Sequence, residues 1–267
     1  MKLAGRWLVL FLWLCGGLLG CTAVSTEPSQ ELPHITILAA ASLTDAFTEV
    51  GQAFAKTHGN GVDLSFSFAG SSKLAVQLQE GTVADVFASA NETQMMTAVS
   101  ANRIQADTIQ IFATNQLTII VPTDNPANIA TLADLANPGV KLLLALPGVP
   151  VRDYTDALVQ TMAADFQARF YANLVSEGQN VRQVVAQIAL GEADAGIVYS
   201  SDVTPGMADS LQQIALPEGQ NVVAFYPIGR VTDAPQPEVA QQFIDFVLSA
   251  EGQAILARWG FGPASVQ

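Results

Sequence analysis

The sequence predicts an α/β protein with two lobes, each a mixed, mainly parallel sheet flanked by helices. Apolar strand-like runs alternate with amphipathic helix-like runs, which is typical of parallel strands joined by crossover helices. A second alternation begins after Asn115, and the chain returns near Phe225 to its last helices. The roughly 235 residues of the body are enough for two compact lobes. In such folds ligands bind at the carboxyl ends of strands and between lobes, so we expect an interlobe cleft.

The first lobe begins with three strand–helix pairs. In the first helix, Leu43, Phe47 and Phe54 recur at helical spacing, and Gly59 and Gly61 end it. The pairs are strand 34–40 with helix 43–58, strand 62–68 with helix 72–79, and strand 85–89 with helix 92–101.

The second lobe is expected to span residues 115–225, so the first comprises 33–114 plus 226–267. Helices at 238–248 and 252–259 then complete the first lobe. The elements expected in the second lobe are strands 116–121, 141–145, 193–198 and 213–216, and helices 132–136, 153–176 and 181–190. A strand expected at 222–228 returns the chain to the first lobe.

The N-terminus is typical of a lipoprotein secretion signal. Lys2 and Arg6 precede a continuous apolar run at 7–14, which is too short for an ordinary membrane-spanning helix. The motif Leu-Leu-Gly-Cys at 18–21 then predicts cleavage before Cys21 and diacylation of its thiol. Residues 1–20 are therefore expected to be the signal peptide.

Residues 21–32 are polar and contain proline, as a flexible tether between a lipid and a folded body would be. We expect an extracytoplasmic body anchored to the outer face of a membrane through lipid at Cys21. Cys15 leaves with the signal, so no disulfide or thiol chemistry is expected in the body. A monomer is expected.

Composition and motifs argue against two classes of function. The net charge of −13 disfavours nucleic acid as a partner, because its phosphates require a basic surface. His34 and His58 are the two histidines, and no nucleophile elbow, metal-ligand spacing or phosphate-binding glycine loop occurs. The sequence therefore predicts neither an enzyme, nor a cation site, nor a cofactor.

Ser42 and Ser71 each lie where a strand-like run ends and a helix-like run begins. A helix start offers backbone N–H groups that have no partner inside the helix, together with the positive end of the helix dipole. Two such sites on neighbouring parallel strands could converge on one small oxyanion. The alternative is that both serines only cap their helices.

Seven segments carry distinctive residue patterns, at 39–44, 67–75, 84–91, 180–182, 196–202, 246–253 and 259–261. Together they resemble the periplasmic molybdate-binding proteins of ABC importers. The resemblance implies a class II periplasmic-binding-protein fold that closes on molybdate or tungstate and delivers it to a membrane permease. At Asn91 the family more often has aspartate.

The resemblance also implies a ligand set made of neutral donors from both lobes. These are the hydroxyls and amides of Ser42 and Ser71, the hydroxyl of Tyr199, and the backbone amides of Val151 and Val181. For Tyr199 the alternative is a packed ring with a local hydrogen bond.

Arg152 stands where the family commonly has glycine. Two interpretations of this departure remain open: its side chain points to solvent, or it supplies a cationic contact near the anion.

Two other functions remain open on the sequence. One is a receptor for another tetrahedral oxyanion, such as sulfate or thiosulfate. The other is a lipoprotein hydrolase that uses Ser42 or Ser71 as a nucleophile, although the sequence nominates no base for either serine.

Overall fold

The computed structural model describes residues 32–207, 209–217 and 219–264. The expected signal peptide, the expected lipidation at Cys21 and nearly all of the expected tether lie outside these residues. Within them, no helix combines the length and apolar character that crossing a membrane requires.

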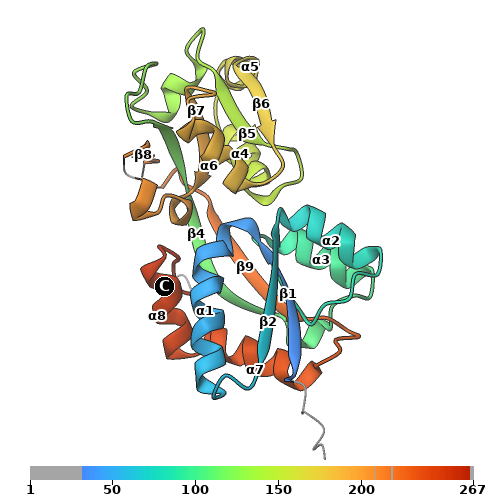
Figure 1. The fold of residues 1–267 in the computed structure, drawn as a ribbon. Coiled ribbons are helices and arrows are strands. Elements are labelled where there is room, and N and C mark those ends of the chain that lie inside the picture. Colours follow the sequence, from blue (N-terminus) through green and yellow to red (C-terminus); the bar gives the residue numbers. More distant parts are fainter. Residues whose placement is uncertain (1–31, 208, 218, 265–267) are drawn as a thin grey trace, which may run out of the picture. The chain divides into compact units, whose positions relative to one another are not determined.

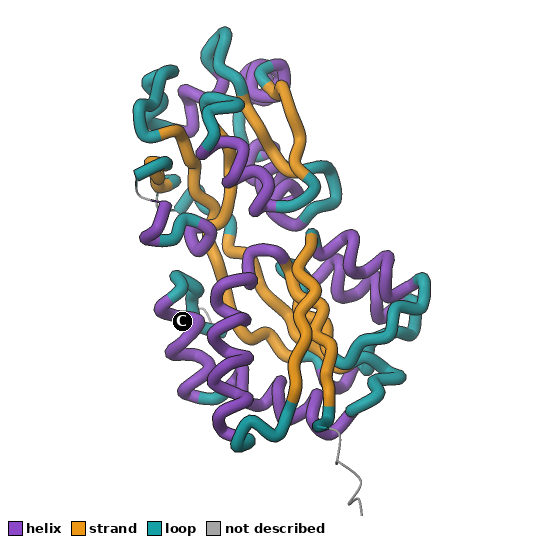
Figure 2. Tube along the Cα trace, in the orientation of Figure 1, coloured by secondary structure: helices purple, strands orange, loops and turns teal. Residues whose placement is uncertain are grey.

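Nine strands form the sheets, in the order β2-β1-β3-β9-β4-β7-β5-β6, with β8 also paired to β4 (Figures 1 and 2). β1, β2 and β3 are parallel, as are β5, β6 and β7, whereas β4 and β9 run antiparallel to their neighbours. The strands are β1 His34–Ala40, β2 Asp63–Ala69, β3 Val86–Ala88, β4 Gln110–Pro122, β5 Leu142–Ala145, β6 Leu174–Gly178, β7 Ala195–Tyr199, β8 Leu211–Ala215 and β9 Val223–Arg230.

The long strand β4 belongs to both sheets. Its first part pairs with β9 up to Gln116, and from Leu117 onward it pairs with β7 and β8 (Figure 1). We call the sheet of β1, β2, β3 and β9 with its helices the first lobe, and the sheet of β5 to β8 with its helices the second lobe. The mixed, mainly parallel α/β fold expected from the sequence is confirmed.

Eight α-helices and five short 3-10 helices occur in the described residues. The α-helices are α1 Thr44–Thr57, α2 Ser71–Gln79, α3 Glu92–Ser100, α4 Pro150–Gln160, α5 Ala164–Ala172, α6 Val181–Ala189, α7 Pro237–Leu248 and α8 Ala250–Arg258. The 3-10 helices are η1 Ala41–Leu43, η2 Ala106–Thr108, η3 Leu132–Ala136, η4 Ser200–Asp202 and η5 Pro205–Met207.

The alternation of side chains along β1 gives the first lobe two cores. Ile37 faces the side of α1 and α7, where Phe47 and Phe243 pack edge to face with ring centroids 5.9 Å apart. Leu38 faces the other side and packs with Leu74 of α2. Because both faces are covered, the sheet holds the carboxyl ends of β1 and β2 at fixed positions.

The prediction of one long helix at 153–176 was wrong in its extent. The structure has two helices there, α4 and α5, followed by the strand β6, which pairs in parallel with β5. The apolar spacing of Phe166 and Phe170 is helical, but it stops at Asn173, the C-cap of α5. Beyond it, tertiary pairing with β5 decides the conformation. β4 also begins at Gln110 rather than at 116.

Candidate anion-binding site

Four helix starts carry the residues expected to bind a ligand. Ser71 is the first residue of α2, Val151 the second of α4 and Val181 the first of α6, while Ser42 lies in η1. Each of these helices follows the carboxyl end of a parallel strand. N–H groups in a first helical turn have no acceptor inside the helix, and the helix dipole there favours negative charge.

Gly70 shows that three of these helix starts touch. A Cβ on Gly70, the N-cap of α2, would lie 2.9 Å from the carbonyl oxygen of Gln179. It would also lie 3.7 Å from Cβ of Asn180, the N-cap of α6, and 3.8 Å from Cγ1 of Val149, the N-cap of α4. The structure therefore brings the segments of Ser71, Val151 and Val181 together across the two lobes.

Further contacts join the lobes beside these helix starts. Asn91 Nδ2 donates to Asp153 Oδ2 at 3.3 Å, and Gln94 Nε2 donates to the Gly148 carbonyl oxygen at 3.2 Å. Asn91 also caps α3 through its Oδ1, which accepts from the Gln94 N–H. An aspartate at position 91 would face the Asp153 carboxylate without a proton to donate. Asparagine supplies that donor.

The two serines are not helix caps, so the capping interpretation was wrong. The N-caps are Ala40 for η1 and Gly70 for α2, and neither helix has a side-chain cap. Ser71 Oγ instead accepts from the Ala90 N–H at 3.0 Å, and Ser42 Oγ lies 3.0 Å from the Tyr226 hydroxyl. Accepting from Ala90 leaves the Ser71 proton available to a ligand.

The hydroxyl of Tyr199 is buried without a partner. Tyr199 ends β7 and is 1% exposed, and its hydroxyl has no hydrogen bond within the described part of the chain. Its ring packs edge to face against Tyr154 and Tyr226, at centroid distances of 6.4 and 5.8 Å. Burial, with the nearby Tyr226 hydroxyl, raises the pKa of Tyr199 well above its usual value, so the group keeps its proton. Of the alternative for Tyr199, the packed ring is present, whereas its local hydrogen bond is not found among the described residues.

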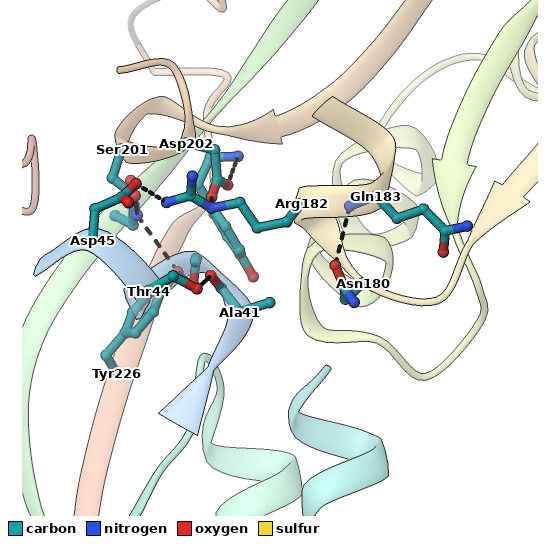
Figure 3. A network of polar contacts seen from close by, with 12 residues as sticks. Ala41, Thr44, Asp45, Asn180, Arg182, Gln183, Ser201, Asp202 and Tyr226 are labelled. Atoms are coloured by element: carbon teal, nitrogen blue, oxygen red, sulfur yellow. Dashed lines mark hydrogen bonds and ion pairs between the residues drawn. The ribbon is translucent and has the colours of Figure 1, made fainter. Parts of the chain in front are cut away.

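Arg182 of α6 links the lobes beside the site (Figure 3). Its Nη2 lies 2.6 Å from Oδ2 of Asp45, in the first turn of α1, and its Nε lies 3.5 Å from Oδ1 of the buried Asp202. Asp202 Oδ2 accepts from the Tyr199 N–H at 3.1 Å. Sequence reasoning gave Arg182 no such role, although it directly follows Val181.

The buried Asp202 makes the stability of the protein depend on pH. Burial raises the pKa of Asp202 to about 7, against the opposing effects of Arg182 and the Tyr199 N–H. A carboxyl whose folded pKa is raised keeps its proton on folding, so stability is lost as pH rises toward the folded pKa.

We therefore expect Asp202→Asn to become more stable relative to the wild type as pH rises from about 4 to 7, by up to about 4 kcal/mol. Urea unfolding of both proteins across this range measures the difference. Curves of the free energy of unfolding against pH that run parallel for the two proteins would contradict the raised pKa of Asp202.

Arg152 is a packing residue of the second lobe and is only 8% exposed, so the solvent-facing interpretation was wrong. Its Nε binds Asp156 Oδ1 at 2.8 Å, and its Nη1 binds Glu177 Oε1 at 2.7 Å and the Ala145 carbonyl oxygen at 3.1 Å. These acceptors engage the guanidinium within its own lobe, so the arginine is tied to them rather than free for a ligand.

In the described residues, no histidine is hydrogen-bonded to Ser42 or Ser71. His34 binds Asp63 and Ser65 at the start of β1, and His58 lies at the C-terminal end of α1. Over the same residues, no group of three or more histidine, cysteine, aspartate or glutamate side chains could hold a metal ion. The partners of Ser42 and Ser71 are a phenol and a backbone amide, and neither is a base.

Comparisons with known proteins agree over nearly the whole body. The family described as "Bacterial extracellular solute-binding protein" matches residues 35–262. The molybdate-binding protein ModA of Mycobacterium tuberculosis is 37% identical over 253 residues, covering 93% of this chain and 94% of that protein.

Two solved structures share the fold. One is the substrate-binding domain of a putative molybdenum ABC transporter from Clostridium difficile, with a TM-score of 0.65 and 26% identity over 88% of this chain and 99% of that one. The other is the sulfate-binding protein SubI of M. tuberculosis, with a TM-score of 0.77 and 22% identity over 86% and 87% of the chains. From the family match and the curated relative together, the chain belongs to the bacterial extracellular solute-binding proteins.

Proposed function

We propose that this protein captures molybdate, and tungstate, outside the cytoplasm and delivers it to the membrane permease of an ABC importer. The observation that carries the proposal is the buried Tyr199 hydroxyl, a donor with no partner among the described residues, beside helix starts that converge from both lobes. The 37% identity to a molybdate-binding protein supports the choice of ligand.

The proposed ligands are neutral donors. They are the hydroxyls and amides of Ser42 and Ser71, the hydroxyl of Tyr199, and the amides of Val151 and Val181. Hydrogen bonds to a charged group contribute roughly 1.5–3 kcal/mol each, so several together can offset the cost of removing water from a dianion. The net charge of −13 does not oppose this, because a buried site responds to the dipoles that line it.

The nearby carboxylates face donors of the protein itself. Asp153 accepts from the Gly148 N–H at 3.1 Å and from Asn91, and Asp202 faces the Tyr199 N–H and Arg182. A site lined by hydroxyl and amide donors suits a fully ionised oxyanion. It leaves the proton of hydrogenphosphate without a partner, which is costly when the group is buried.

The alternatives fit less well. A sulfate or thiosulfate receptor would share the fold, but the solved sulfate-binding protein is more distant in sequence than the molybdate-binding relative. A serine hydrolase requires a base beside its nucleophile, and the contacts of Ser42 and Ser71 offer none. We infer a non-enzymatic monomer without a cofactor, tied to the membrane by lipid at Cys21.

An oxyanion panel tests the function. Calorimetry on the purified body should give tight binding of molybdate and tungstate, weak binding of sulfate and negligible binding of phosphate, and melting temperature should rise with the first two alone. Ser42→Ala and Ser71→Ala should each weaken molybdate binding by roughly 10- to 100-fold, the equivalent of one hydrogen bond to a charged group.

Ser72→Ala is the matched control, because Ser72 is the neighbour of Ser71 and is not among the proposed ligands. It should bind molybdate like the wild type. Phosphate binding as strong as molybdate binding would refute the donor-only site. Ester hydrolysis that is lost in Ser42→Ala would favour the enzyme.

A further inference from the structure

A chain of buried polar groups leads from Ser42 to the backbone of β4. Ser42 Oγ lies 3.0 Å from the Tyr226 hydroxyl, and Asn115 Nδ2 lies 3.5 Å from the same hydroxyl. Asn115 Oδ1 accepts from the Gln116 N–H at 2.9 Å. Ser42, Tyr226 and Asn115 are at most 3% exposed. Tyr226 lies on β9 and Asn115 on β4, where these two strands pair with each other, and Figure 3 shows the Tyr226 ring close to η1.

The Gln116 N–H fixes the orientation of the Asn115 amide, and the direction of the Ser42–Tyr226 hydrogen bond follows from the partners that remain. An amide N–H can only donate, so the Gln116 N–H identifies Oδ1 of Asn115 and leaves its NH₂ group facing Tyr226 and Ser201. That NH₂ group can only donate in turn, so the Tyr226 oxygen accepts. Of the groups that contact the Tyr226 hydroxyl among the described residues, Ser42 Oγ is the one that can accept, so the buried Tyr226 proton points to it.

Tyr226 keeps this proton because burial raises its pKa well above the usual value. Ser42 Oγ accepts from Tyr226, and its own single proton is left for the ligand. Because the ligand is then the acceptor left for the serine proton, the Ser42 hydroxyl donates to the ligand rather than accepting from it.

We propose that Tyr226 and Asn115 are positioning residues that hold the Ser42 hydroxyl as a donor and so select fully deprotonated oxyanions over hydrogen-bearing ones. The proposal rests on the proposed function, in which Ser42 binds the anion. Neither residue needs to touch the ligand. Their effect is to deny an acceptor to the proton of hydrogenphosphate or hydrogenarsenate.

Sulfate and hydrogenphosphate are the probes for this selection. Above neutral pH both are tetrahedral dianions, and they differ by one proton. Their dissociation constants, measured by competition with molybdate, give a sulfate-to-hydrogenphosphate preference for each variant. A change in fold or in site charge alters the affinity for both anions, whereas the direction of the Ser42 hydrogen bond alters the preference.

Tyr226→Phe removes the donor to Ser42, so the serine hydroxyl can rotate and accept. We expect molybdate binding to weaken roughly tenfold and the preference for sulfate to fall by a similar factor. Asn115→Asp replaces the NH₂ donor by a carboxylate oxygen of the same shape. This oxygen accepts the Tyr226 proton, so the hydrogen bonds from position 115 to Ser42 reverse their direction. The preference should fall at least as far, while the added negative charge weakens both dianions alike.

Tyr154→Phe is the matched control. Its hydroxyl accepts at 3.2 Å from the N–H of Phe225, the residue before Tyr226 in the sequence. It is not hydrogen-bonded to Ser42. It should leave the preference unchanged. If the wild type binds molybdate and Asn115→Asp keeps the wild-type preference for sulfate over hydrogenphosphate, the positioning role is overturned. This holds even if Tyr226→Phe fails to fold. A wild type that binds none of the three anions instead overturns the proposed function, and the positioning role with it.

Discussion

Tyr199→Phe is expected to bind molybdate roughly 10- to 100-fold more weakly while its free energy of unfolding stays the same or rises. The two effects separate because the hydroxyl is buried without a partner in the described residues. Removing it costs the folded protein no hydrogen bond and relieves a desolvated polar group. With molybdate bound, the same change removes a hydrogen bond to a charged ligand. Calorimetry and urea unfolding of the variant measure the two quantities.

Tyr171→Phe is the matched control for this change. The Tyr171 hydroxyl donates to Asp156 at 2.6 Å within the second lobe. This variant should lose stability, by about 1 kcal/mol, and keep wild-type affinity. If Tyr199→Phe shows that same pattern, its hydroxyl has a structural partner and is not a ligand.

Gly70→Ala is expected to weaken molybdate binding by roughly 10- to 100-fold, because the added methyl group would meet a backbone carbonyl oxygen of the other lobe at 2.9 Å. The backbone of Gly70, at φ −59° and ψ 135°, suits alanine, so the substitution strains neither lobe by itself. The lobes must move apart to make room, which separates α2 from α6. Isothermal titration with molybdate measures the loss.

Gly206→Ala provides the comparison, since a Cβ there meets nothing within 4 Å. The unliganded Gly70→Ala protein should melt at the wild-type temperature or slightly above it, because alanine reduces the entropy of the unfolded chain. Wild-type affinity in Gly70→Ala would mean that the contact of Gly70 with Gln179 is not part of the ligand-bound arrangement.

Local patterns were enough to predict most of the fold. Helix α1 could be predicted from the spacing of Phe47 and Phe54 and from the glycines after it, and its bounds differ little from those expected. β6 could not, because Leu174–Gly178 is a short strand whose paired partner is β5. Nothing within its five residues distinguishes it from the last turn of a helix.

The site shows the same division between local and distant information. Ser42 and Ser71 were identifiable because a strand-to-helix junction is visible in the sequence. The hydrogen-bond partners in and beside the site could not be predicted from the sequence. Tyr226 lies 184 residues from Ser42, and Asp45 lies 137 residues from Arg182. Such contacts depend on how the chain returns through β9, and no local pattern encodes them.

The return of the chain through β9 also fixes an order of assembly. The only antiparallel neighbour described for β3 is β9, and Phe47 packs on Phe243 of α7, yet β9 and α7 follow the whole second lobe in the sequence. During synthesis from the N-terminus, the second lobe is complete before the first can close its sheet. Until then the edge of β3 is not paired with β9, and the apolar face of α1 is not packed against α7. The lobe that the chain begins first is finished last, so the risk of aggregation falls on the first lobe.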